Sequence, residues 1–303
     1  MSRSAEILVG TSEGLRAWGA RERSHLVGHE ITALAREGRR WWAIVDGRTV
    51  WRADGHGEWA EVVSVAGAGA TCLAASPAGL LVGTAGAHLF RLQDDVLVPV
   101  ESFETVDGRQ AWYTPWGDPP DTRSIAVDAG DAIYVNVHVG GVVRSTDGGR
   151  TWRPTLDVET DVHQVLADPA VPGRIFAAAA VGLAVSTDGG ESWRVETENL
   201  HARYLRAVAV TDGAVLVTAS TGPRGKRAAV YRRDLGEAAA FERCREGVPE
   251  WFPANIDTHC LVASGPTVVF GTEDGRVYRS SEEGRSWELL AKGLPPVGCV
   301  ALG

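Results

Sequence analysis

The sequence lacks any long apolar segment. No run of residues is long enough to span a bilayer, and Met1–Glu6 leads into the first predicted strand with no apolar signal-peptide region before it. We therefore expect a cytoplasmic protein without a membrane partner. Long amphipathic helical patterns are also missing, whereas 36 glycines and 14 prolines in 303 residues favour many short strands joined by tight turns.

An excess of positive charge is absent as well. The formal net charge is −9. Nucleic acid is therefore not an expected partner, since the neutralisation of phosphates supplies most of the nonspecific affinity for it. Cysteine is scarce, and the four residues occur singly, without CxxC spacing, at Cys72, Cys244, Cys260 and Cys299. This pattern favours buried thiols in a reducing compartment, with a disulfide as the alternative.

One short pattern occurs three times, at Ser145–Trp152, Ser186–Trp193 and Ser280–Trp287. Each copy has an acidic residue in a tight turn, where it can accept backbone N–H groups, a glycine for positive φ, and a tryptophan that packs on the sheet. These features are typical of an Asp-box, which we interpret as a structural clip and not as a catalytic element. A weaker copy lies at residues 52–59.

The spacing of the box tryptophans gives the period of the repeat. Trp152 and Trp193 are 41 residues apart, and Trp193 and Trp287 are 94 apart, or two units of 47. Propeller blades of four strands have about this length. We predict an all-β, seven-bladed β-propeller that forms a single domain over residues 1–303, with six blades as the alternative. Six of the predicted blades are 31–63, 71–103, 122–156, 161–200, 204–245 and 257–290.

The seventh blade is predicted to be divided between the two ends of the chain. Val297–Leu302 would pair with Ile7–Thr11, which would close the arrangement and remove exposed sheet edges. Phe103 and Phe241 fall about where a box tryptophan is expected in two units that lack a box.

The boxes resemble those of the Asp-box (BNR) repeat family, which includes sialidases, xyloglucan-degrading glycosidases, sortilin-like receptors and photosystem assembly factors. The segments 116–120, 138–141 and 161–164 also look like those of uncharacterised bacterial propellers that carry the label glycosyl hydrolase. This resemblance implies the fold more specifically than the function. The sialidase Arg-Ile-Pro motif does not occur in the sequence, and a Tyr/Glu nucleophile pair cannot be placed.

Four consecutive units carry a basic side chain at one repeat position of the first strand: Arg123, His163, Arg206 and His259. Because the first strand of a propeller blade lines the central channel, we expect these side chains to converge at the channel mouth opposite the boxes. The sequence leaves one alternative open. An Asp two residues before such a side chain, as in Asp161 and Asp257, could form ion pairs between blades without any ligand.

Further side chains are expected at the same mouth. His138 and Glu273 end equivalent second strands, and the insertion 104–121 reads as a stiff aromatic lid or a plug. The lid residues are Trp112, Tyr113, Trp116, Asp118 and Asp121. A second insertion, 220–227, adds Arg224, Lys226 and Arg227. We read His25, His29, His56, His88 and His201 as surface or core residues.

These residue types support several functions. Two arginines beside two histidines favour a small polar, anionic ligand. In a hydrolase or lyase, His163 or His259 would be the general base, and Arg123 and Arg206 would stabilise negative charge. Alternatively, His138, His163 and His259, with Glu273 as a fourth ligand, could hold a divalent metal.

Two other classes of function stay open. The same face could bind a protein or peptide without catalysis, with Trp112 and Trp116 as anchors. A glycoside hydrolase would need two carboxylates about 5 to 9.5 Å apart, for which Asp118, Asp121 and Glu273 are candidates.

Overall fold

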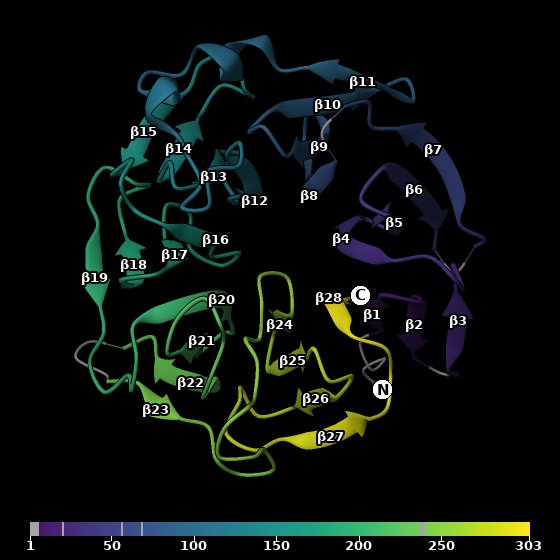
Figure 1. Ribbon diagram of the computed structural model, residues 1–303, viewed down its shortest axis with the longest axis vertical. Coiled ribbons are helices and arrows are strands. Elements are labelled where there is room, and N and C mark those ends of the chain that lie inside the picture. The colour runs from purple at the N-terminus through teal and green to yellow at the C-terminus, as the bar shows by residue number, and fades with distance from the viewer. Residues whose placement is uncertain (1–5, 20, 56, 68, 237–239) are drawn as a thin grey trace. The chain divides into compact units, whose positions relative to one another are not determined.

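The computed structural model describes residues 6–19, 21–55, 57–67, 69–236 and 240–303. His56, in the weaker box, lies outside them. Over the described residues the strands form seven four-stranded sheets, which are the blades of a β-propeller (Figure 1). The predicted fold class and number of blades are therefore confirmed. The chain groups into two compact units, Met1–Leu34 with Thr197–Gly303, and Ala35–Glu196, and the single-domain organisation stays a prediction.

The first unit contains three of the sheets. Their strand orders are β28-β1-β2-β3, β20-β21-β22-β23 and β24-β25-β26-β27. The strands are β1 (Ile7–Thr11), β2 (Gly14–Trp18), β3 (Arg23–His25), β20 (Tyr204–Val210), β21 (Ala214–Ser220), β22 (Ala229–Asp234), β23 (Glu242–Arg243), β24 (Leu261–Ser264), β25 (Thr267–Gly271), β26 (Val277–Ser280), β27 (Glu288–Ala291) and β28 (Val297–Leu302).

The second unit contains three more sheets, β8 to β11, β12 to β15 and β16 to β19, together with β5 to β7. The boundary between the units falls within β4, the first strand of the β4-β5-β6-β7 sheet. The strands are β4 (Ile31–Glu37), β5 (Arg40–Val45), β6 (Thr49–Asp54), β7 (Ala60–Ser64), β8 (Ala70–Ser76), β9 (Gly79–Thr84), β10 (Leu89–Gln93), β11 (Val96–Pro99), β12 (Asp121–Val127), β13 (Ile133–His138), β14 (Val142–Ser145), β15 (Arg153–Leu156), β16 (Val162–Ala167), β17 (Ile175–Ala179), β18 (Gly182–Ser186) and β19 (Arg194–Glu196).

Two short 3-10 helices, η1 (Glu101–Thr105) and η2 (Arg109–Ala111), lie in the segment between β11 and β12. Phe103 of η1 is fully buried and packs edge-on against Trp152, with ring centroids 5.2 Å apart. Phe103, which comes from a repeat unit that lacks an Asp-box, therefore packs against the tryptophan of the following Asp-box. Among the described residues, no helix is long and apolar enough to cross a membrane.

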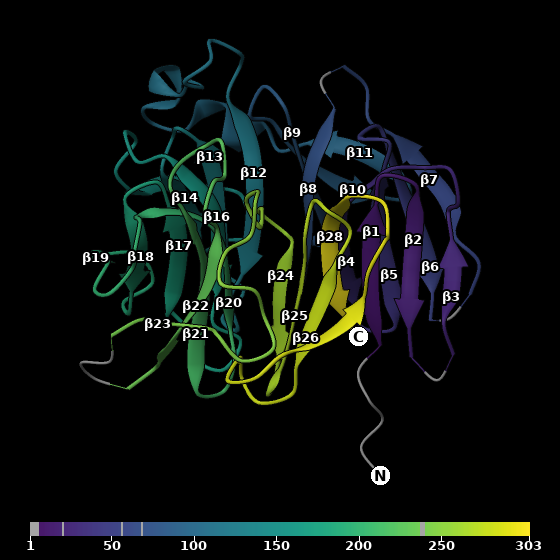
Figure 2. The same ribbon diagram turned by 60° about the horizontal axis from the view of Figure 1, so that its bottom comes forward.

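The two ends of the chain share one sheet, as predicted. β28 pairs antiparallel with β1, with Ile7 opposite Leu302 and Val9 opposite Val300, and both views show the yellow strand beside the purple one (Figures 1 and 2). Ile7, Val9, Val297 and Val300 are all buried in one apolar cluster of the first unit. Closure therefore buries apolar side chains as well as pairing a strand edge.

Glycine is required where inner strands of neighbouring sheets approach closely. A Cβ built on Gly83 of β9 would lie 2.4 Å from Cγ2 of Thr122 on β12. In the first unit, a Cβ on Gly10 of β1 would lie 2.8 Å from Cγ2 of Ile31, the first residue of β4 in another sheet. Larger residues at these two positions would push adjacent strands apart. All four cysteines are buried free thiols, as expected.

The Asp-boxes hold their turns by side-chain acceptors, as predicted. Oδ1 of Asp147 accepts the backbone N–H groups of Arg150 and Thr151, both at 2.9 Å, and Oδ2 accepts the Thr151 hydroxyl at 2.6 Å. These bonds, led by the Thr151 hydroxyl, hold the pKa of Asp147 well below its ordinary value. Asp188 accepts the N–H and hydroxyl of Ser192 in the same way.

The weaker box is built differently. Oδ1 of Asp54 accepts a hydrogen bond from Nε of Arg40 at 2.9 Å, across β5 and β6. The turn is closed by the backbone instead, because the N–H of Gly57 donates to the Asp54 carbonyl oxygen at 3.0 Å. Its acidic residue therefore supports strand pairing.

Asp147→Ala should lower the free energy of unfolding by about 1 kcal/mol at pH 7, because it removes a charged acceptor from two backbone N–H groups. The loss should shrink as the pH falls below the ordinary Asp range, since a depressed folded pKa contributes stability only where the carboxylate is ionised. Urea unfolding at pH 7 and pH 3 measures both effects. Asp107→Ala, at an exposed position, is the control, and an equal loss in both variants would contradict the assignment.

Deletion of residues 297–303 should remove β28 from one edge of β1, which keeps β2 at its other edge, and expose the apolar cluster around Val9. We expect a cooperative loss of stability and concentration-dependent association through the open edge. Thermal melting and light scattering test this. A truncated protein that melts at the same temperature as the full chain and stays monomeric would refute the closure.

Candidate functional site

Two β-bulges place basic side chains at one position of neighbouring inner strands in the second unit. The register of β12 against β13 shifts at Arg123, and the register of β16 against β17 shifts at His163. In both strands the residue is the extra one of the bulge. A bulge redirects its side chain and is common beside functional sites. The predicted repeat equivalence of these two residues is therefore seen in the strand register.

His138 comes to the same end of these strands from β13. It is the last residue of that strand and lies opposite Asp121, the first residue of β12. The Asp-box of this sheet follows Ser145, which pairs with Ile133 at the opposite end of β13. His138 and the box therefore lie at opposite ends of the sheet, as predicted.

Asp161 lies between the two histidines. Its Oδ1 is 3.0 Å from Nε2 of His138 and 3.3 Å from Nε2 of His163. The imidazole centroids are 5.8 Å apart. The His163 side chain is completely buried and that of His138 is 5% exposed, whereas that of Asp161 is 23% exposed. The carboxylate is thus the part of this cluster that faces solvent.

Oδ1 of Asp161, the oxygen that both histidines approach, is itself shielded from solvent. Three potential metal-ligand atoms, one from each residue, lie within 4.8 Å of one another. Two imidazoles and one carboxylate form a common ligand set for catalytic zinc and for other divalent transition metals.

The two carboxylates around His138 have opposite electrostatic surroundings. Burial alone would raise the pKa of Asp161, but its contacts with His138 and His163 outweigh burial and hold the pKa well below its ordinary value. Burial raises the pKa of Asp121, and the charge of Asp118 adds a smaller upward effect. Arg123 and His138 lower this pKa, but they offset the increase only in part. The site therefore combines a firmly ionised carboxylate with one that protonates more easily.

A buried polar network fixes the spacing of the strands beneath the cluster. The Ser124 hydroxyl donates to Oδ1 of Asn136, and the Asn136 amide donates to the Val162 carbonyl oxygen at 2.8 Å. The N–H of Val165 donates to the Ser124 hydroxyl at 2.8 Å. These bonds link β12, β13 and β16, the three strands that carry or adjoin the histidines and Asp161.

The predicted aromatic lid divides into a core part and an exposed part. Trp112 is 8% exposed and packs against Phe103, with Arg109 stacked on its ring. Its packing is that of a core residue, whereas Tyr113 and Trp116 are 44% and 60% exposed. The insertion 104–121 contacts the turn between β13 and β14, where the N–H of Tyr113 donates to the Val139 carbonyl oxygen at 3.1 Å.

In the first unit, Arg206 forms an ion pair between two sheets. Its Nη1 lies 3.1 Å from Oδ1 of Asp257, and its guanidinium stacks over the Tyr204 ring at 5.2 Å. This is the ion-pair alternative that the sequence left open. His259 follows in the turn before β24, with a φ of 65°. Its proposed role as a base or metal ligand stays a prediction.

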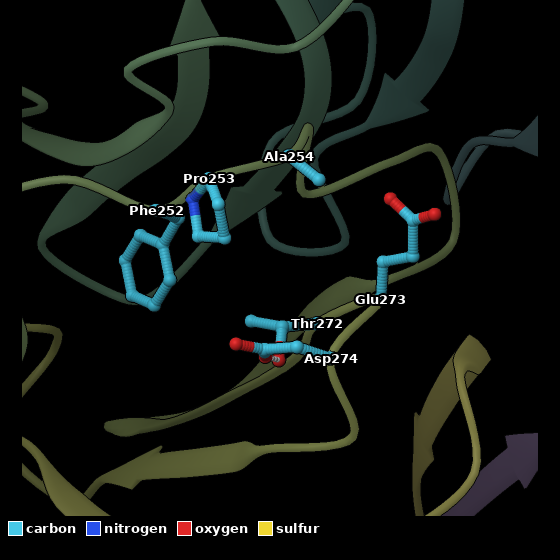
Figure 3. A pocket seen from close by; sticks show the side chains of 6 residues that line it. All are labelled: Phe252, Pro253, Ala254, Thr272, Glu273 and Asp274. Atoms are coloured by element: carbon cyan, nitrogen blue, oxygen red, sulfur yellow. Dashed lines mark hydrogen bonds between the residues drawn. The ribbon is translucent and has the colours of Figure 1, made fainter.

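Glu273 lines a separate cavity of about 260 Å³ in the first unit. Phe252, Pro253 and Ala254 form one wall, and Thr272 and Asp274 flank Glu273 on the other (Figure 3). The Asp274 carboxylate accepts hydrogen bonds from Nε of Arg276. The role of Glu273 as a ligand-binding residue stays a prediction.

Two features of the sites were missed from the sequence. From the sequence, Asp161 is expected only as an acid that could form an ion pair across a blade boundary, and it is not included among the metal ligands. His201, read as a surface or core residue, lines a cavity with Tyr231 and Trp251. No repeat pattern marks that cavity, because its residues come from a turn, two outer strands and a loop.

Comparison with solved structures supports the fold. No family model matches the chain, and no curated protein matches its sequence. YCF48 from Cyanidioschyzon merolae is similar with a TM-score of 0.61 and 14% identity over 94% of this chain and 95% of that one. YCF48 bound to D1 peptide gives 0.61 and 13%, over 89% and 87%.

An enzyme is also similar in structure. The GH74 enzyme from Niastella koreensis has a TM-score of 0.64 and 12% identity, over 93% of this chain and 46% of that chain. At these identities the likeness shows the β-propeller fold alone. The closer resemblance to the Asp-box family stays a prediction.

The Arg206 ion pair can be tested by a double-mutant cycle with Arg206→Ala and Asp257→Ala. We expect a coupling of about 0.5 to 1 kcal/mol in the free energy of unfolding, because the Asp257 side chain is 49% exposed and solvent screens the pair. Urea unfolding of the four proteins at low and high salt measures this coupling, which should fall with salt. Zero coupling would return Arg206 to the candidates for ligand binding.

Proposed function

We propose that this protein is a metal-dependent hydrolase of a small polar, anionic substrate, with His138, Asp161 and His163 as the metal ligands. The observation that carries the proposal is the convergence of two imidazole nitrogens on one carboxylate oxygen. Protein ligands around a tetrahedral zinc ion, at about 2.0 to 2.1 Å from it, are separated by roughly 3.3 Å. The distances of 3.0 and 3.3 Å to Oδ1 of Asp161 are close to this separation, and the three ligand atoms all lie within 4.8 Å of one another.

The burial of the histidines favours a metal over a histidine general base. A general base must reach the proton that it removes, whereas His163 is completely buried and His138 almost so. The Nε2 atoms of the two histidines and the Asp161 carboxylate would hold the metal, which would supply a nucleophile by lowering the pKa of water.

Asp121 and Arg123 would assist the metal. A carboxyl group with a raised pKa can donate a proton to a leaving group, while the ionised Asp161 remains a ligand. The charge of Arg123 acts on Asp121 and would stabilise an anionic substrate or its developing negative charge. The two carboxylates thereby take different roles because their surroundings differ.

A second candidate function is the binding of a protein or peptide. The exposed rings of Tyr113 and Trp116 favour it, since large aromatic side chains anchor protein interfaces. A structurally similar protein, YCF48, is described with a bound D1 peptide. Glycoside hydrolysis by Asp118, Asp121 or Glu273 stays a prediction. Cytoplasmic location and the absence of nucleic-acid binding stay predictions.

Metal content of the purified protein, and titration of the chelator-treated protein with Zn²⁺ and Mn²⁺, test the proposal. We expect one metal per chain, and affinity that falls as the pH drops, because protons compete for the imidazoles and the carboxylate. His163→Gln and Asp161→Asn should each weaken binding by about 100-fold or more. His88→Gln, which replaces a histidine that is 47% exposed, should leave binding unchanged.

Hydrolysis is measured separately, with small phosphate esters, carboxylate esters and amides as substrates of the metal-loaded protein. Activity that is lost in Asp161→Asn and reduced in Asp121→Asn is the expected result. Failure to bind either metal would overturn the metal site. Tight metal binding with no hydrolysis of any substrate class would overturn the hydrolase and leave the metal site standing.

A further inference from the structure

A second cavity lies in the first unit, and none of its lining residues belongs to the metal cluster. Its volume is about 570 Å³, which falls within the range of small-molecule sites, about 300 to 1,000 Å³. Its walls come from the turn before β20, from β22 and β23, and from the loop after β23. The lining residues are Asn199, His201, Tyr231, Phe241, Glu242, Arg243, Arg245 and Trp251.

His201 is fixed in one orientation at the wall of this cavity. Its Nδ1 lies 2.9 Å from the Tyr231 hydroxyl, and its Nε2 lies 2.9 Å from the Arg227 carbonyl oxygen. Because a carbonyl oxygen can only accept, we assign the proton to Nε2, and the Tyr231 hydroxyl then donates to Nδ1. The imidazole also stacks on the Tyr231 ring, with centroids 5.7 Å apart. His201 therefore lines the cavity as a neutral side chain that is held in one orientation.

Two arginines are held on the ring of Trp251. The guanidinium carbon of Arg227 lies 4.4 Å from the ring centroid, and that of Arg243 lies 4.5 Å from it. Nη1 of Arg243 is also 3.6 Å from the Glu250 carboxylate. These contacts restrict the guanidinium of Arg243, so little side-chain entropy is left to lose when it binds a ligand.

The charge of the cavity opposes that of the whole protein. Arg243 and Arg245 line it, and Glu242 is the one carboxylate among the lining residues. Arg227 adds a positive charge on the ring of Trp251. The chain as a whole carries a net charge of −9. A cavity with a local excess of guanidinium groups attracts anions in spite of that background.

We propose that this cavity is a second ligand site, which binds a small organic oxyanion. Arg243 and Arg245 would pair with its carboxylate or phosphate group. Asn199, an amide that can donate or accept, would contact a polar part of the molecule. The volume accommodates an organic molecule around the charged group, since a bare ion would leave most of the space filled only with water. This site is independent of the proposed hydrolase.

Calorimetric titration at physiological salt tests the site with two classes of probe. Glucose 6-phosphate and inorganic phosphate represent phosphates, and citrate and acetate represent carboxylates. We expect either glucose 6-phosphate to bind more tightly than inorganic phosphate or citrate to bind more tightly than acetate. The class that binds identifies the anionic group of the ligand.

Three variants assign the binding to the arginines. Arg245→Ala should weaken it by about tenfold or more, since charge-assisted hydrogen bonds are lost. Arg243→Lys keeps the charge but not the planar fork and should also weaken it. Arg224→Ala removes an exposed arginine that does not line the cavity and is the control for net charge. Melting temperatures verify that each variant is folded.

Two results would overturn the proposal. The first is the absence of heat or thermal stabilisation with all four probes at roughly millimolar concentration. The second is an equal loss of binding in Arg224→Ala and Arg245→Ala, which would show that net charge and not this cavity attracts the anion.

Discussion

Close packing between the inner strands of neighbouring sheets is the constraint on which the candidate metal site depends. In the second unit, the side chains of Ser124 and Asn136 bridge β12 and β13 to the backbone of β16. Asp161, just before β16, is thereby brought within 3.0 Å of His138 on the adjacent sheet. Because the bridging groups are buried, any sliding of one sheet along the other would leave polar atoms unsatisfied, which is costly. The position of the carboxylate is therefore set by the fold beneath it.

The sequence predicts the fold well because the signals for it are local. An Asp-box specifies its own turn within eight residues, and Asp147 makes its hydrogen bonds within four residues of itself. The spacing of such turns then counts the blades, and the apolar run at Val297–Leu302 needs only a free strand edge to pair with. The weaker box shows where the pattern misleads. Asp54 has the right spacing, yet its carboxylate binds Arg40, since a strand neighbour offers a charged donor.

The sites are predicted less completely because their contacts lie between repeats. The equivalence of Arg123 and His163 follows from the register. The sequence left open an ion pair of Asp161 across a blade boundary, but it could not show that one carboxylate would contact both His138 and His163. It also left open whether Arg206 binds a ligand or pairs with Asp257, and the structure has the ion pair. Trp112 illustrates a further limit. An aromatic residue in a long insertion reads as a lid, whereas Phe103 from the same insertion provides the surface against which it is buried.

One repeat position has thus acquired different roles in different blades. A β-bulge projects a basic side chain at this position, and the outcome depends on what the neighbouring sheet offers. Where the neighbour offers an acid, as Asp257 does for Arg206, two opposite charges neutralise each other and the contact is complete. Where it offers a second imidazole, as His138 does for Asp161 and His163, one carboxylate faces two nitrogen ligands, and a cation can join them. A repeat of a single structural unit can therefore contain a stabilising ion pair at one blade boundary and a candidate metal site at another without any change of backbone plan.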